Sequence, residues 1–368
     1  MKTNERQTAW FIPAFFSGAI WVSGLTFACV ANAENAPPEN INLQLQTWTA
    51  IAEAKGILRE EFGKVGVKKV NLIAQSSGEL LGAESAAVGG GTLAFAQRMI
   101  YPAFVQKANG IPAVIVWLSE PSNRYRTPIF VSAANKNINT VADLDGKKFG
   151  SSRVSCYWSA PFEILNNAGL PLDSRLKKGR VRYENIESPA VAIQALLSGE
   201  KDATAGHLAA NQFTAPYLQG KFKKIAGPAD TGVYANYGGR VSYFAHQDFA
   251  AKYPSVVRAF LRSRERARDW TYDHVDEAAQ IVSKALRIPE DVAKFQITHL
   301  GQWDFMAGEP DANKARHAIK EFQKWYVAHG DDILVDKQLT DKQIDGFIDG
   351  KFFAGGSHSI YSDRFSTY

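Results

Sequence analysis

Cysteine is almost absent from this chain of 368 residues, which contains only Cys29 and Cys156. Cys29 falls in the N-terminal segment considered below, so we expect Cys156 to remain as the one thiol of the folded protein. A single thiol excludes an internal disulfide and a cysteine-rich metal site. Stability must therefore come from a hydrophobic core, and a chain with 45% hydrophobic residues is long enough to bury one.

The chain also lacks clusters of charge. Its 42 basic and 37 acidic residues give a net charge of +5, and no run contains five or more consecutive basic residues. Nucleic-acid binding needs clustered Lys and Arg that neutralise phosphates, so we expect no nucleic-acid partner. The 29 glycines and 15 prolines are ordinary in number, which excludes a disordered or collagen-like chain. The length favours two domains or lobes.

Residues 1–33 have the features of a secretory signal peptide. Lys2 and Arg6 form a positive start, residues 9–30 are uncharged and mostly apolar, and Ala31-Asn32-Ala33 is a small-residue cleavage site. We therefore expect cleavage before Glu34 and an exported, soluble mature protein. A retained membrane anchor is the alternative, because an uncharged stretch of this length can span a bilayer. No later stretch is long and apolar enough to do so.

Strand-like and helix-like patterns alternate over the next part of the chain. Residues 41–46 alternate apolar and polar side chains as a strand does, and helical spacing of apolar residues then predicts a helix over 50–62. Further strands are predicted at 69–74, 92–96, 113–118, 129–132, 181–185 and 202–206, with helices between them. Beyond Gln247 the pattern is almost wholly helical. This order predicts an α/β protein with right-handed crossovers.

Four loops after predicted strands are rich in hydroxyl groups, glycine and aromatic rings. They are residues 47–49, 76–78, 89–92 and 151–159. In open α/β sheets such loops lie at the carboxyl ends of strands, where helix N-termini offer amides to an anion. We therefore expect them to hold a sulfonate or carboxylate. The candidate ligand residues in these loops are Trp48, Thr49, Ser76, Ser77, Gly91, Thr92, Cys156, Tyr157 and Trp158.

Each of these candidates has a purely structural alternative. Ser76 and Ser77 fit helix caps, and Gly89-Gly90-Gly91 fits a turn that requires positive φ. The glycines lack the spacing and the lysine of a phosphate-binding loop, so we expect no nucleotide. Burial in the core is the ordinary expectation for Trp48 and Trp158, and the sequence leaves core and cleft open for both.

Six segments recur in an order and spacing that resembles one family. They read AEAKGIL, SSGELL, ANGIPAVIV, INTVADLDGKKFG, AIQALLSGEKDAT and FAAKYPSVVRAFLRSRERARDW. Over about residues 40–275 the chain resembles the solute-binding proteins of ABC importers for taurine, aliphatic sulfonates and nitrate. The related group that handles thiamine-pyrimidine precursors shares the pattern.

The resemblance implies a type II periplasmic-binding-protein fold, in which two α/β lobes joined by two crossing strands close over a ligand cleft. The crossings would fall near 127–130 and 232–237. Lobe 1 would comprise 34–129 and 235–368, and lobe 2 would comprise 130–234.

The implied function is that of a periplasmic binding protein which delivers a small organic anion, aromatic ones included, to a membrane permease and its ATPase. We expect a monomer that needs no cofactor and no metal.

The resemblance also implies individual ligand residues. The segment from Gly146 to Leu170 matches the taurine-type pattern without a gap, so Ser155 would bind the sulfonate. Cys156, Tyr157 and Trp158 are bulkier than the residues usual there, which favours a larger or aromatic anion over taurine. Further candidates are His207, in a loop that contacts ligand in the family, and Tyr234, at the return crossing. A structural role is the alternative for both. Arg153, in the same turn as Ser155, could supply positive charge to the ligand, and a solvated surface position is its alternative.

An enzyme on the same fold is the second interpretation. The fold also hosts a desulfinase that acts on an aromatic sulfinate and a pyrimidine-precursor synthase. The nucleophilic cysteine of the desulfinase follows the first strand, where this chain has Leu45-Gln46-Thr47-Trp48-Thr49 and no thiol. None of the seven histidines is a neighbour of Cys156 in sequence, and no HExxH motif occurs. We therefore expect a binding protein and no catalysis, with a sensor domain as a third interpretation.

Overall fold

The computed structural model describes residues 35–74, 83–120, 127–208, 210–226, 240–300 and 307–353. These all belong to the unit formed by residues 34–368, and residues 1–33 form a separate unit. The predicted signal peptide, the predicted return crossing, Ser76, Ser77 and Tyr234 lie outside the described residues. The expectations for them stay predictions.

The first of two sheets combines N-terminal strands with one strand from later in the chain. Its strands are β1 (Asn40–Gln44), β2 (Lys69–Ile73), β3 (Phe95–Met99), β4 (Ala113–Leu118) and β10 (Val241–His246). β1 and β2 are parallel, and β10 runs antiparallel between β3 and β4. The amide of Ala94 donates to the carbonyl of Asn42 at 3.0 Å and joins these groups in the order β2-β1-β3-β10-β4. All six residues of β4 are buried.

The second sheet has the same plan. Its strands are β5 (Ile129–Ser132), β6 (Lys148–Ser151), β7 (Arg182–Asn185), β8 (Thr204–Ala205) and β9 (Phe222–Ala226). β6 and β7 are parallel, and β5 runs antiparallel between β8 and β9. A bridge between Phe149 and Ala203 joins these groups in the order β7-β6-β8-β5-β9. Two such sheets confirm the predicted α/β class, whereas the lobe boundaries at 129 and 234 stay predictions.

Helices alternate with the strands as far as residue 218. They are α1 (Thr47–Ala54), α2 (Ile57–Gly63), α3 (Ala83–Gly89), α4 (Ile100–Ala108), η1 (Val141–Leu144), α5 (Cys156–Asn167), α6 (Pro189–Ser198) and α7 (Asn211–Leu218). The prediction of one helix over 50–62 is wrong, because Gly56 adopts φ 71° and separates α1 from α2. The strand predicted at 92–96 begins later, at Phe95, because residues 90–92 form a turn in which Gly91 has φ 73°.

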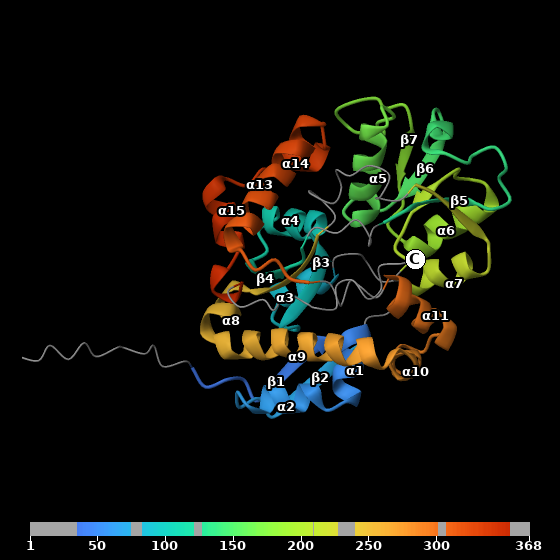
Figure 1. The fold of residues 1–368 in the computed structure, drawn as a ribbon. Helices are drawn as coiled ribbons and strands as arrows, with labels where there is room; N and C mark the ends of the chain where they lie inside the picture. Colours follow the sequence, from blue (N-terminus) through green and yellow to red (C-terminus); the bar gives the residue numbers. More distant parts are fainter. Residues whose placement is uncertain are drawn as a thin grey trace, which may run out of the picture. The chain divides into compact units, whose positions relative to one another are not determined.

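The chain after β10 is helical, as predicted. It forms α8 (Gln247–Lys252), α9 (Pro254–Asp273), α10 (Val275–Leu286), α11 (Glu290–Phe295), the π-helix η3 (Gln296–Leu300), α13 (Ala312–Ala328), α14 (Asp332–Asp336), α15 (Asp341–Phe347) and η4 (Gly350–Phe352). α9 packs along α1 and α2 (Figure 1). Tyr326 of α13 and Asp331, the N-cap of α14, form hydrogen bonds with α5. None of the described helices combines the length and the apolar character needed to cross a bilayer.

Candidate functional site

A cavity of about 330 Å³ is lined by residues of β1 and β3, of helices that follow strands of both sheets, and of the loops beside them. This volume is at the lower end of the range for small-molecule sites. The lining comprises Gln44, Gln46, Thr47, Gln97, Arg98, Met99, Pro102, Ser155, Cys156, Tyr157, His207, Ala210, Asn211, Gln212, Leu286 and Gln296.

Four helices begin at this cavity. α1 begins at Thr47, α5 at Cys156 and α7 at Asn211, all of which line it, and α4 begins directly after the lining residue Met99. The first amides of a helix have no acceptor within that helix, and its N-terminus carries a partial positive charge. Four such ends around one cavity favour an anionic ligand.

Arg98 supplies a full positive charge to the cavity. Within the described part of the chain, it is the one charged side chain in the lining, which contains no Asp or Glu. Burial lowers the pKa of Arg98 to about 10, so the guanidinium remains cationic at neutral pH. β3 fixes its backbone, because its carbonyl accepts a hydrogen bond from Ser242 Oγ at 2.9 Å. The lining therefore selects for negative charge.

Side-chain amides build an uncharged polar wall beside Arg98. Gln46 Nε2 donates to Gln44 Oε1 and to Gln97 Oε1, both at 3.0 Å. Gln97 Nε2 in turn donates to the Tyr243 hydroxyl at 2.9 Å, and Trp48 Nε1 donates to Gln46 Oε1 at 3.1 Å. This network holds Gln46 and Gln97 in place at the cavity and links them to the core behind it.

Cys156 and His207 meet in the same cavity. Cys156 Sγ lies 2.6 Å from His207 Nε2, and Thr127 Oγ1 lies 3.1 Å from His207 Nδ1. Burial raises the pKa of the Cys156 thiol to about 12 and lowers the pKa of His207 to about 3. Both groups are therefore neutral at pH 7. Their separation of 51 residues explains why no local sequence motif indicated this pair.

Gly206, the residue before His207, allows a close approach between the end of β8 and α7. A Cβ on Gly206 would lie 2.2 Å from the ring of Phe213, so a larger residue would force β8 and α7 apart. The imidazole also packs against Tyr157, with the ring centroids 5.1 Å apart. The position of His207 is thus set by packing on both sides.

Four of the predicted ligand residues line the cavity, namely Ser155, Cys156, Tyr157 and His207. Ser155 is also the N-cap of α5. Its Oγ accepts from the Tyr157 amide at 3.0 Å and donates to the Ser152 carbonyl at 2.8 Å. The hydroxyl is thereby engaged in capping as well as lying at the cavity.

Two further candidates, Trp48 and Thr49, lie beside the cavity but outside its lining. Trp48 is fully buried and packs edge-on against Tyr243 and Phe260. Thr49 Oγ1 accepts from the Gln46 amide at 2.7 Å, which is a cap of α1. The structure thus places Trp48 in the core, the position that the sequence had left open.

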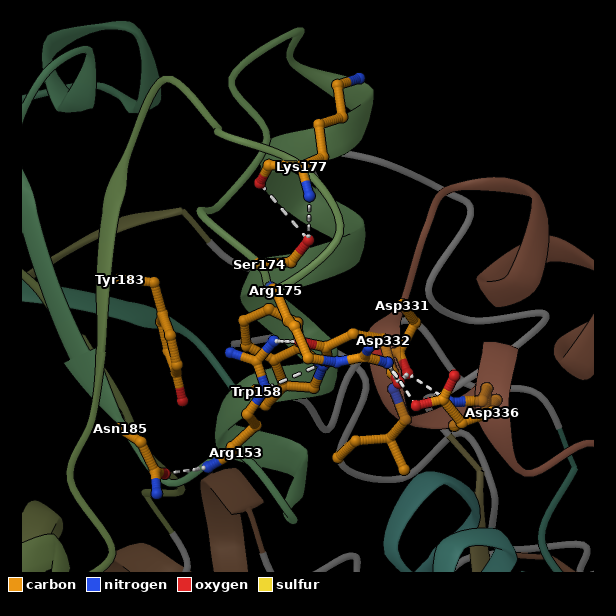
Figure 2. Close-up of polar contacts among 12 residues, drawn as sticks. Arg153, Trp158, Ser174, Arg175, Lys177, Tyr183, Asn185, Asp331, Asp332 and Asp336 are labelled. Carbon is orange, nitrogen blue, oxygen red and sulfur yellow. Dashed lines mark hydrogen bonds and ion pairs between the residues drawn. The ribbon is translucent and has the colours of Figure 1, made fainter.

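Trp158 is buried as well, on the side of α5 that faces α14 (Figure 2). Its Nε1 donates to Asp331 Oδ2 at 2.7 Å. The Arg153 guanidinium lies 4.1 Å from the Trp158 ring and is paired with Asp332. Trp158 is therefore a core residue, and Arg153 is neither a solvated side chain nor part of the cavity lining.

Gly91 and Thr92 are exposed residues of the turn after α3 and lie outside the lining. The φ of 73° at Gly91 matches the turn interpretation rather than a ligand role. Arg98, in contrast, was missed. The available signal was a cationic residue inside a strand whose other residues are uncharged. In the described ranges no group of three or more His, Cys, Asp or Glu side chains could hold a metal ion.

A family model described as NMT1/THI5 like matches residues 69–278, which is more than half of the chain. The chain belongs to the NMT1/THI5-like family. This family match and the similar solved structures described below confirm the family that the six sequence segments indicated. No curated protein matches the chain.

Solved structures of similar fold include two sulfonate-binding proteins. The alkanesulfonate-binding protein SsuA from Xanthomonas axonopodis pv. citri, bound to MOPS, has a TM-score of 0.68 at 16% identity and covers 85% of this chain and 99% of its own. The periplasmic aliphatic sulphonate binding protein SsuA from Escherichia coli has a TM-score of 0.66 at 20% identity and covers 83% and 97%.

The periplasmic nitrate-binding protein NrtA from Synechocystis PCC 6803 has a TM-score of 0.59 at 13% identity and covers 87% of this chain and 88% of its own. These likenesses confirm the predicted periplasmic-binding-protein fold.

Proposed function

We propose that this chain is the solute-binding protein of an ABC importer and that it binds a small organic anion beside Arg98. The observation that carries the proposal is the charge of the cavity. Among the described residues its lining contains one cation, no carboxylate and residues at the start of four helices. Such a lining attracts an anion, and it contains no carboxylate that would repel one.

The remaining lining residues suit an anion with an organic part. Met99, Pro102 and Tyr157 offer apolar or aromatic contact, and Asn211 and Gln212 add side-chain amides to the lining. We propose a sulfonate or carboxylate, aromatic ones included. Two proteins of the same fold are named for binding sulfonates and a third for binding nitrate, which supports an anion without selecting one.

Transport follows from this binding. We propose that the predicted signal peptide, residues 1–33, exports the chain to the periplasm, where the lobes close on the anion by a hinge movement. The closed form would then be read by a membrane permease whose ATPase lies on the far side of the membrane. The chain would act as a monomer, without a cofactor, and would release its ligand unchanged.

A thermal-shift screen tests this function. Purified protein is heated with sulfonates, carboxylates, nitrate and pyrimidine precursors, and with cations and neutral sugars for comparison. We expect at least one organic anion to raise the melting temperature by several degrees, because ligand at about 100 times its Kd adds about 2.7 kcal/mol of stability. Stabilisation by cations or sugars alone, or by no compound, would contradict the proposal.

A further inference from the structure

The contact between Cys156 and His207 has no role in simple anion binding. An anion needs strong hydrogen-bond donors, and a thiol is a weak one. His207 Nε2 is in contact with the thiol sulfur, so that nitrogen is occupied by Cys156. Nevertheless Cys156 Sγ and His207 Nε2 are in direct contact in the cavity, and Thr127 Oγ1 lies 3.1 Å from Nδ1 and 3.4 Å from Nε2 of the same ring.

The geometry points to a nucleophile and its proton acceptor. We propose that Cys156 adds reversibly to a bound anion that carries an electrophilic carbon, with His207 as the base and Thr127 as the positioning residue. The arrangement meets the requirements for such a pair: the base lies within hydrogen-bond reach of the nucleophile, and a third group orients the base. This proposal rests on the proposed function, which supplies an anionic ligand. It adds that the ligand carries an electrophilic carbon.

Two features of the fold assist the thiol. Cys156 is the first residue of α5, a helix of 12 residues, and the N-terminus of a helix stabilises developing negative charge. Arg98 lines the same cavity, and its positive charge lowers the pKa of Cys156, against the larger effect of burial. The same guanidinium would hold the acid group of the ligand while the thiol attacks.

When the electrophilic carbon is that of an aldehyde or ketone, the addition needs no further reactant. The Sγ–C bond forms, the π pair of the C=O bond moves to oxygen, and the thiol proton passes through His207 Nε2 to that oxygen. The product is a hemithioacetal or hemithioketal, and no oxidant, reductant or leaving group is required. The reverse step returns the ligand unchanged, which is compatible with a transport protein.

The protonation states define how the pair would work. The groups that face His207 are Cys156 and Tyr157 of α5 and Thr127 before β5, and Arg98 of β3 lines the same cavity. Thiol and imidazole are both neutral in the resting site, so the thiol loses its proton only as it attacks. The rate should therefore be almost flat between about pH 5 and 8, whereas attack by a free thiolate rises about tenfold per pH unit.

Alkylation kinetics test the proposal with two probes. Iodoacetate is a small carboxylate with an electrophilic carbon, and iodoacetamide is its neutral analogue. With either, Sγ–C forms, C–I breaks, iodide leaves and His207 takes the proton. In the full chain carrying Cys29→Ser, we expect one carboxymethyl group per chain by intact mass, added about tenfold faster than the group from iodoacetamide, and a flat pH profile.

Single substitutions test the role proposed for each of the three residues. Cys156→Ser should abolish labelling, Arg98→Gln should remove the preference for iodoacetate, and His207→Gln should slow both reagents and introduce the rise with pH. Arg182→Gln, an exposed arginine on β7, is the matched control and should keep the wild-type preference and pH profile.

Faster reaction with iodoacetamide, or a tenfold rise per pH unit that His207→Gln leaves unchanged, would overturn the proposal. The comparison of the two reagents on the Cys29→Ser chain needs no further variant, so it holds even if a cavity variant fails to fold. Anion stabilisation without the iodoacetate preference would remove the covalent step alone. Rapid carboxymethylation without any stabilising anion would instead remove the transport function.

Discussion

Arg98 and Arg153 lie on two sides of the same helix start and differ in their surroundings. The Arg153 guanidinium donates to both carboxylate oxygens of Asp332 and packs against the rings of Trp158 and Tyr183 (Figure 2). Burial opposes its charge, but the bonded Asp332 carboxylate outweighs this effect and raises the pKa of Arg153. For Arg98 burial dominates and lowers the pKa.

The comparison shows that neighbours, more than burial, separate the two roles. The chain supplies a carboxylate to Arg153, a residue that stabilises the fold. Around Arg98 the cavity lining, within the described ranges, consists of amides, hydroxyls, a thiol and apolar groups. Arg153 therefore has a structural role, and Arg98 remains the residue beside which we propose that the ligand binds.

The hydrogen bonds between α5 and the helices beside Arg153 also determine where the cavity lies. The Asp331 carboxylate accepts from Trp158 Nε1 and from the Tyr101 hydroxyl at 3.0 Å. The Tyr326 hydroxyl donates to Glu163 and bonds the Ser159 carbonyl at 3.1 Å. These contacts attach α5 to α4, α13 and α14, so they fix the helix whose first residue is Cys156.

Removing the paired arginine should have the largest effect. Arg153→Met leaves the Asp332 carboxylate, with 7% of its side chain exposed, without its cation. We expect the free energy of unfolding to fall by about 3 kcal/mol in urea denaturation. Arg182→Met, at an exposed position, should change it by less than about 0.5 kcal/mol.

The double variant Arg153→Met with Asp332→Leu sharpens this test. Removing both charges should restore part of the lost stability, because no uncompensated carboxylate remains. Two single effects that simply add in the double variant would contradict a coupled pair.

The next largest effect is on the pH dependence of stability, through His207. His207 is neutral in the fold because burial lowers its pKa to about 3, while an unfolded histidine titrates near 6.5. Between these values the unfolded chain binds more protons, so acid should favour unfolding. His207→Gln should therefore reduce the loss of stability between pH 6.5 and 4.5 by up to about 2 kcal/mol. The matched control is His317→Gln, at an exposed position of α13, and a wild-type pH profile in His207→Gln would contradict the buried neutral state.

Local patterns in the sequence predicted the sheets and most helices, because alternation and helical spacing depend on neighbours along the chain. They failed where one residue changes the backbone, as at Gly56, which divides a predicted helix in two. The site could not be predicted in the same way, because its contacts join residues that are far apart in the sequence. Trp48 and Trp158 face the core because Phe260 and Asp331 lie against them, and Cys156 meets His207 because α5 packs against β8.

The smallest stability effect should come from the cap of α5. Ser155→Ala removes the bond from the Tyr157 amide and should cost about 1 kcal/mol in the free energy of unfolding. Ser155→Asn keeps a capping oxygen and should restore most of this stability. If the alanine variant were as stable as the wild type, the hydroxyl would not act as the cap.

The central claim is that Arg98 provides the charge that binds the ligand. Titration calorimetry with the most stabilising anion from the screen tests it most directly, on the wild type, Arg98→Gln and the control Arg182→Gln. We predict that Arg98→Gln raises Kd by about 10- to 100-fold while the control stays within about twofold of the wild type. An unchanged Kd in Arg98→Gln would contradict the assignment of the site.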